Sequence, residues 1–154
     1  MKLSRKSDYA LRALFTLVDE YGRGPVSVRE MAERNDVPPR FLEQIMLDLK
    51  RKGWVESIAG RIGGFVLAKQ PHQITMGEVV RHFDGVLAPL HCVSTSDYRP
   101  CSQESHCRFR RVLLNVRNYV ARIMDQADLA SVAKGAPVRR DEVFSMEFSD
   151  GGGI

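Results

Sequence analysis

Apolar residues near the start of the chain recur at intervals of three and four, which is the period of a helix with one buried face. This stripe predicts a first helix that Ser7 or Asp8 caps and that residues 22–25 end. Its apolar positions are Leu11, Leu14, Phe15, Val18 and Tyr21. A second, short helix is predicted from a capping box of Ser27 with Glu30. Together the two helices indicate a small helical domain.

A third helix and a β-hairpin are predicted to follow. The helix runs from about Pro39 to Lys52, and Gly53 ends it. Its inward-pointing apolar positions are Phe41, Leu42, Ile45, Met46 and Leu49. Residues 54–58 and 65–68 are predicted to be strands around a glycine-rich turn. Helix, short helix, turn, helix and hairpin is the order of a winged helix-turn-helix.

The second half of the chain is predicted to contain a short helix, an irregular loop and a long helix. A capping box of Thr75 and Glu78 opens the short helix, which ends near Phe83. Residues 86–106 show no sustained period, whereas residues 107–126 carry the period of an amphipathic helix. Its apolar positions are Phe109, Val112, Leu113, Val116, Val120, Ile123 and Ala127. Its exposed face is predicted to carry Arg108, Arg110, Arg111, Arg117 and Arg122.

These elements predict a mainly α fold with a small β-hairpin wing, divided into three segments. Residues 1–70 form the winged helix-turn-helix domain, residues 71–132 hold the connecting helix, the loop and the long helix, and residues 133–154 form a mobile tail. A length of 154 residues suits one domain, and a hydrophobic fraction of 44% excludes disorder of the whole chain. No apolar run is long enough to span a bilayer and no secretory signal is recognisable, so we expect a cytoplasmic protein.

Charge and surface pattern both favour binding to double-stranded DNA. The net charge is +4, and the excess lies in residues 1–70, with 13 Lys and Arg against 9 Asp and Glu, as contact with phosphates requires. Arg40, Glu43 and Gln44 share the outer face of the third helix, in the half where recognition helices touch bases in the major groove. Arg61, at the hairpin tip, can enter the minor groove. The alternatives are a solvated helix face and a plain tight turn.

The three cysteines of the chain lie within one short stretch. Cys92, Cys101 and Cys107 have the spacing C-x8-C-x5-C. A cytoplasmic chain has little use for structural disulfides, and three thiolates from a flexible loop suit a metal or an iron–sulfur cluster. Zinc is an alternative, although the C-x2-4-C spacing typical of structural zinc sites is missing. Unligated or redox-active thiols are the other alternative.

Several segments of the chain together resemble one known family. They are MKLSRKSDYALRAL at 1–14, FLEQ at 41–44, GWV at 53–55, GRIGGF at 60–65 and ITMGEV at 74–79. With the three-cysteine loop that opens a long helix, they resemble the IscR/NsrR family of bacterial transcription regulators. The resemblance implies a homodimer that packs its long C-terminal helices together and binds a near-palindromic operator. It also implies an iron–sulfur cluster, held by the three cysteines, that tunes DNA affinity.

Within this family the chain resembles the NsrR branch, which senses nitric oxide. The IscR pattern has a histidine three residues after the last cysteine, where this chain has Arg110. In NsrR-like proteins the position of Asp8 supplies a fourth ligand from the partner subunit, whereas a simple helix cap is the other interpretation of Asp8. His91 and His106 flank cysteines and are second choices for that ligand. A 4Fe–4S cluster is favoured, and a 2Fe–2S cluster is the alternative because eight residues separate the first two cysteines.

The expected function is that of a homodimeric transcription repressor, and not of an enzyme. An iron–sulfur cluster would control its DNA affinity in response to nitric oxide, redox state or iron supply. Arg40, Glu43 and Gln44 would read bases in the major groove, and Arg61 would read the minor groove. The residues assigned to phosphates are Arg5, Lys6 and Arg51. The alternatives are a cluster-free or zinc-containing thiol-redox regulator and an iron–sulfur electron carrier. No catalytic dyad or nucleotide fingerprint supports an enzyme.

Overall fold

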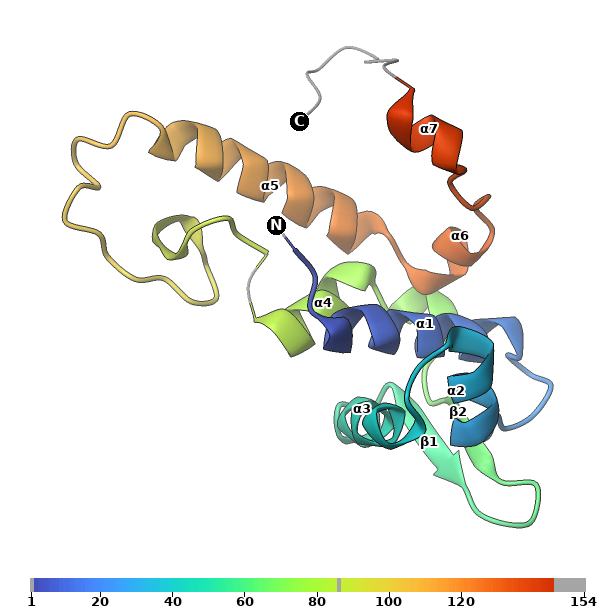
Figure 1. The fold of residues 1–154 in the computed structure, drawn as a ribbon. Helices are drawn as coiled ribbons and strands as arrows, with labels where there is room; N and C mark the ends of the chain where they lie inside the picture. The colour runs from blue at the N-terminus through green and yellow to red at the C-terminus, as the bar shows by residue number, and fades with distance from the viewer. Residues whose placement is uncertain (1, 86, 146–154) are drawn as a thin grey trace.

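The N-terminal part of the protein is a winged helix-turn-helix, as the computed structural model shows (Figure 1). The structure describes residues 2–85 and 87–145. The elements of this part are α1 (Arg5–Asp19), α2 (Val28–Asn35), α3 (Pro39–Arg51), β1 (Val55–Ile58) and β2 (Gly64–Leu67). Three helices followed by an antiparallel hairpin confirm the predicted fold class.

The starts of α1 and α2 differ from the predicted caps. Ser4 caps α1 by accepting a hydrogen bond from the backbone N–H of Ser7, so the helix begins one turn earlier and Asp8 lies inside it. The prediction that Ser7 or Asp8 is the cap is therefore wrong. Ser27 caps α2 as predicted, but the carboxylate of Glu30 pairs with Arg34 and leaves the capping box half formed.

The hydrophobic core joins both halves of the chain. Trp54, at the start of the wing, and Leu14 of α1 are buried together with Ile74, which precedes the fourth helix, and Leu129 near the end of the chain. The wing sits close to the segment before α2, because a Cβ at Gly64 would lie only 2.3 Å from a backbone oxygen there. Burial of this apolar surface fixes the wing and α3 relative to α1.

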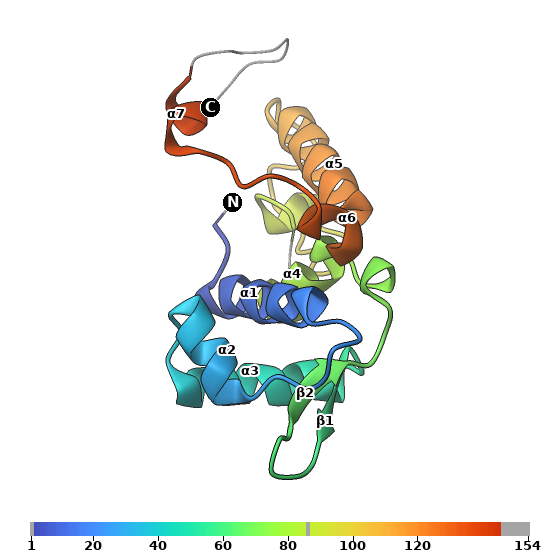
Figure 2. The same ribbon diagram turned by 90° about the vertical axis from the view of Figure 1, so that its right-hand side faces the viewer.

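The second half of the chain lies on the side of α1 away from the wing (Figures 1 and 2). Its elements are two 3-10 turns, η1 (Pro71–Gln73) and η2 (His91–Val93), and the helices α4 (Met76–Asp84), α5 (Arg110–Gln126), α6 (Leu129–Ala133) and α7 (Arg140–Phe144). The predicted capping box of Thr75 and Glu78 is present at the start of α4. No helix in the described ranges is long and apolar enough to cross a membrane.

Two expectations about the C-terminal half need correction. Helix α5 begins at Arg110 rather than at residue 107, and no residue of α5 is fully buried within the single chain. Of its apolar positions, Val112, Val116 and Ile123 are exposed, whereas Leu113 and Val120 are half-buried. In the segment predicted as a tail, residues 140–144 form α7, and residues 146–154 lie outside the described residues.

Candidate DNA-binding surface and cysteine-lined cavity

The outer face of α3 presents the three side chains predicted to read bases. Arg40, Glu43 and Gln44 are exposed, while Leu42 and Ile45 of the same turns are fully buried in the core. The buried pair fixes which face of the helix points outward. Within the described part of the chain, the three outer side chains make no side-chain hydrogen bond or ion pair. They are therefore available for contacts with base edges.

Arg61 is exposed in the turn between β1 and β2, and the loop of this hairpin extends away from the helices (Figure 1). The tip is a tight turn in which the N–H of Gly63 donates to the carbonyl of Gly60. A Cβ at Gly63 would come within 2.5 Å of the carbonyl oxygen of Ile58, so only glycine fits there. Arg61 is exposed in this turn, as the predicted contact with a second groove of the DNA requires.

The residues assigned to phosphates divide into two groups. Arg5 is exposed at the start of α1. Lys6 and Arg51 both pair with the carboxylate of Asp48 on α3, the lysine at 3.6 Å. Together with the edge-to-face contact of Tyr9 and Phe41, the Lys6–Asp48 pair ties the first turns of α1 to α3. These cations therefore lie at the border between α1 and α3.

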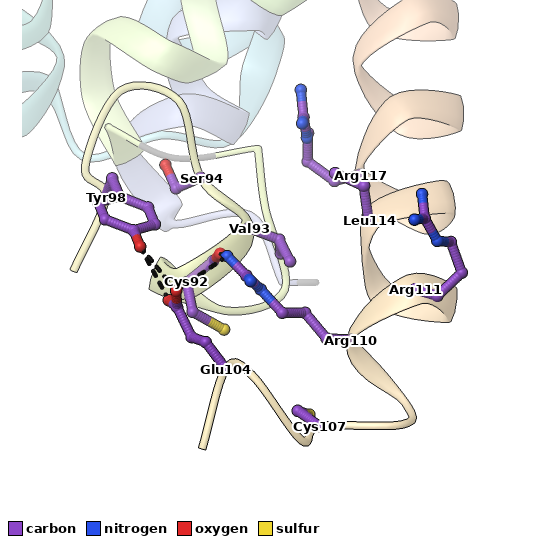
Figure 3. A pocket seen from close by; sticks show the side chains of 10 residues that line it. All are labelled: Cys92, Val93, Ser94, Tyr98, Glu104, Cys107, Arg110, Arg111, Leu114 and Arg117. Atoms are coloured by element: carbon purple, nitrogen blue, oxygen red, sulfur yellow. Dashed lines mark hydrogen bonds and ion pairs between the residues drawn. The ribbon is translucent and has the colours of Figure 1, made fainter. Parts of the chain in front are cut away.

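The structure brings two of the three cysteines together. Cys92 in η2 and Cys107 just before α5 line one cavity of about 510 Å³ (Figure 3). Cys101 is exposed on the loop and does not line this cavity. Across the described residues, no group of three or more His, Cys, Asp or Glu side chains is arranged to hold a metal ion. Three free thiols are a suitable donor set for an iron–sulfur cluster, but Cys101 must move to join the other two.

A polar network holds the cysteine loop against α5. Arg110 donates to the backbone carbonyl of Cys92 at 2.8 Å and pairs with Glu104 at 3.3 Å. Glu104 also accepts hydrogen bonds from the hydroxyl of Tyr98 and from the backbone N–H of Cys101. The bond to the carboxylate raises the pKa of Tyr98, because it stabilises the protonated phenol. Arg110 was predicted to lie on the exposed face of α5, and instead it fastens the loop.

Asp8 lies apart from this cavity within the chain. Its carboxylate accepts two hydrogen bonds from Arg12, at 3.0 and 2.9 Å, and Arg12 also donates to the carbonyl of Asn35 at the end of α2. Sequence reasoning missed the role of Arg12, although its position four residues after Asp8 is the spacing of a helical ion pair. Of the second-choice ligands, His91 pairs with Asp97 at 3.0 Å. The other, His106, is exposed.

The cysteine loop is connected to the DNA-binding domain through the end of α4. The hydroxyl of Ser96 donates to the carbonyl of Gly85 at 2.9 Å, and the neighbouring Asp84 accepts from the backbone N–H of Ser4 at 3.1 Å. Ser4 is the cap of α1. At the other end of α5, Arg81 of α4 binds Asp125 through two contacts of 2.6 and 2.5 Å. The cysteine loop and the start of α1 are therefore bound to two adjacent residues, Gly85 and Asp84.

Comparisons with known proteins agree with this architecture. Residues 3–135 match the Rrf2 family, which is described as an iron-dependent transcriptional regulator. The chain belongs to the Rrf2 family. An rrf2-like helix-turn-helix regulator of Rhodobacter capsulatus is 44% identical over 120 residues, which are 74% of this chain and 80% of that protein. This Rrf2-family chain is thus a DNA-binding transcriptional regulator, and the relatives that it matches are regulators rather than enzymes.

Two further relatives bear on the branch of the family. The regulator CymR of Bacillus subtilis is 32% identical over 88% of this chain and 94% of that protein. Its solved structure, described as the global cysteine regulator of B. subtilis, has a TM-score of 0.72 and covers 89% of this chain and 99% of that structure. NsrR of Bacillus licheniformis is 29% identical over 86% of this chain and 92% of that protein. The similarity therefore does not single out the NsrR branch.

Proposed function

We propose that this Rrf2-family regulator is a dimeric repressor whose DNA affinity is set by an iron–sulfur cluster in the cysteine loop. The observation that carries the proposal is the cavity that Cys92 and Cys107 share at the start of α5. Arg110 of α5 binds the carbonyl of Cys92 in the loop beside this cavity. Ser96 binds the loop to Gly85 at the end of α4. A ligand that closes the loop around the cavity would change both contacts.

The outward stripe of α5 supports a dimer. Phe109, Val112, Val116, Tyr119 and Ile123 repeat at alternating intervals of three and four, and each is between 39% and 63% exposed. This is the spacing of a seam between two helices. An apolar seam of this length is unfavourable in water, and the α5 helix of a second copy would cover it. Such a pair would present two winged helices to the two halves of a near-palindromic operator.

The contacts with DNA are proposed as follows. Arg40, Glu43 and Gln44 on α3 read base edges in the major groove, where each has free hydrogen-bonding groups. Arg61 enters the neighbouring minor groove. The residues proposed to contact phosphates are Arg5, Lys6 and Arg51. Because Lys6 and Arg51 share Asp48, DNA would draw both cations away from that carboxylate.

Cys92, Cys101 and Cys107 are the residues proposed to hold the cluster, with Asp8 of the partner subunit as fourth ligand. A 4Fe–4S cluster is favoured over a 2Fe–2S cluster. When bound, the cluster supplies iron that nitric oxide, oxidants or iron shortage can alter. Within the chain, Asp8 would leave Arg12 to reach a ligand position, and Arg12 would keep its bond to Asn35 at the end of α2 and its position over the ring of Tyr9. This exchange links the state of the loop to the helix-turn-helix.

A second candidate is a cluster-free regulator that senses redox state through its thiols, or one with structural zinc. The observation in its favour is that Cys92 and Cys107 share a cavity while Cys101 lies outside it. Two thiols facing one cavity suit a thiol switch without any third ligand. An iron–sulfur electron carrier is less well supported, because the fold and the relatives are those of transcriptional regulators.

The test is an absorption spectrum of anaerobically purified protein, with iron and sulfide counted per chain. We expect broad visible absorption with about four iron and four sulfide per chain. Replacement of Cys92, Cys101 or Cys107 by Ser should lower both counts, whereas Ser105→Ala in the same loop should not. Protein that stays colourless after anaerobic reconstitution, whether it carries zinc or no metal, would remove the cluster and favour the second candidate.

A further inference from the structure

The cavity beside α5 is lined by more cationic side chains than anionic ones. Arg110, Arg111 and Arg117 line it together with a single carboxylate, that of Glu104. Glu104 is already bound by Arg110 and by the hydroxyl of Tyr98. The dashed lines of Figure 3 end on these groups, whereas none reaches Arg111 or Arg117. Within the described residues, neither of those two arginines has a hydrogen-bond or ion-pair partner.

Arg117 shows that the excess positive charge of this cavity is not all exposed to water. Its Nε atom is buried and has no hydrogen-bond acceptor among the described residues. Buried donors are normally paired, because an N–H that has left water without finding an acceptor is costly. Arg117 therefore lines the cavity with a guanidinium whose hydrogen-bonding capacity is not met by the described residues, which favours an acceptor from outside the chain.

The start of α5 adds a second reason for an anion. Helix α5 has 17 residues, its cap residue Phe109 makes no side-chain hydrogen bond to the helix, and its first turn contains no acidic residue. Instead, Arg110 and Arg111 occupy that turn and line the cavity. The positive end of the helix dipole and these arginines repel one another, and a bound anion would relieve both.

We propose that this cavity binds a small organic anion with two acidic groups, carboxylates or phosphates. Arg117 takes one group, and Arg111 with the first turn of α5 takes the other. Arg117 lies six positions after Arg111, which is about 9 Å along the helix axis, and this spacing suits one molecule with two acidic groups. A cavity of about 510 Å³ has the size of known small-molecule sites. The proposed cluster would occupy the same cavity through Cys92 and Cys107, so the anion site is a property of the metal-free protein and goes beyond the proposed function.

The test is calorimetric titration of the metal-free, reduced full-length chain at constant ionic strength. Citrate is the probe, and acetate and inorganic phosphate are comparison anions with one acidic group. We expect one saturable citrate site per chain, with affinity about ten-fold or more above that for either comparison anion. Arg117→Gln and Arg111→Gln should each weaken citrate binding about ten-fold or more. The matched control is Arg122→Gln, because Arg122 lies on α5 against the ring of Tyr119 and does not line the cavity.

Three results would overturn the site. They are absence of saturable citrate binding by the wild-type chain, wild-type affinity in both arginine variants, and equal loss of binding in Arg122→Gln. Should Arg117→Gln fail to fold, Arg111→Gln carries the test alone, because Arg111 is exposed and bears no structural contact among the described residues. Iron and sulfide are counted on protein that has not been exposed to citrate, so the fate of this site and that of the cluster are measured separately.

Discussion

Asp8 and Arg12 form an ion pair on the exposed side of α1, and Arg12 reaches from there to the end of α2. Asp8 is thus linked to the end of α2 through Arg12, and it is also the residue proposed as a ligand to the cluster of the partner subunit. A carboxylate with one cationic partner can exchange that partner for a metal without unfolding its helix. The exposed position of the pair keeps its contribution to stability small.

Replacing Asp8 with Ala should uncouple the cysteine loop from DNA binding. The variant should fold, because the pair is exposed, but its affinity for an operator should no longer depend on whether the cluster is intact. Fluorescence anisotropy with a labelled operator, selected from random sequences, measures this. Asp19→Ala, at the exposed end of the same helix, is the control. An Asp8→Ala protein that keeps both its cluster and its response would show that the proposed ligand is wrong.

Gln44 tests base reading on α3. Its amide is exposed, and loss of a side chain that pairs with a base edge costs about 1–3 kcal/mol, or about 5-fold to 150-fold in affinity. Gln44→Ala should therefore bind the selected operator more weakly by that factor and bind a scrambled duplex unchanged. Equal weakening on both duplexes would mean that Gln44 acts through the backbone of the DNA and does not read its sequence.

His82 should make stability depend on pH. The ring lies against Trp54, and burial, followed by the nearby charge of Lys52, lowers the pKa of His82. Asp48 acts in the opposite direction, and the remaining charges nearby are those of Arg51 and Lys6. The unfolded chain therefore takes up this proton first as pH falls, and stability is lost below the ordinary pKa of about 6.5.

The urea midpoint of unfolding measures this effect. It should be lower at about pH 5.5 than at about pH 7.5, and the difference should shrink in His82→Gln. A pH dependence that is the same in the variant and in the wild type would assign it to other groups.

At the level of elements, local patterns predicted most of the helices, because caps and periodicity are properties of neighbouring residues. Ser27 and the box of Thr75 with Glu78 start α2 and α4 where the sequence places them. The cap of α1 was misplaced because Ser4 and Ser7 offer the same chemistry one turn apart. Tyr21 was counted in the buried stripe of α1, yet it lies beyond the helix and is exposed.

The faces of α5 could not be assigned from the sequence. A stripe of apolar residues has the same period whether it packs on its own chain or on a second copy. The structure leaves the stripe outward and turns Arg110 and Arg117 toward the cavity. These arginines were expected to be solvated because they are charged. The sequence does not show which acceptor groups the fold brings beside them.

Val116, in the middle of the α5 stripe, tests the proposed dimer. A glutamate there would place an unpaired charge in the interface, which costs about 3–5 kcal/mol. Val116→Glu should therefore be monomeric at micromolar concentration in analytical ultracentrifugation while it keeps its helical circular dichroism. Asn118→Glu, an exposed position on α5 outside the stripe, should remain dimeric. A Val116→Glu protein that still sediments as a dimer would place the interface elsewhere.

At the level of the whole molecule, α5 lies on one side of α1, and α3 with the β-hairpin lies on the other (Figures 1 and 2). The two sides are joined by short contacts, from Ser96 to Gly85 and from Asp84 to the cap of α1. The sequence indicated the two candidate regions but not this connection between them. Loop residues without a period have no local signal for the distant backbone group that they will bind.

The most direct test of the central claim is the operator affinity of one protein preparation before and after loss of its cluster. Anaerobic wild-type protein is measured first as purified and then after treatment with nitric oxide, at fixed salt because phosphate contacts are salt-dependent. We predict that affinity falls about ten-fold or more after treatment, and that Cys101→Ser has the low affinity from the start. Equal affinities before and after treatment, in protein whose iron count shows a full cluster at the start, would contradict control of DNA binding by the cysteine loop.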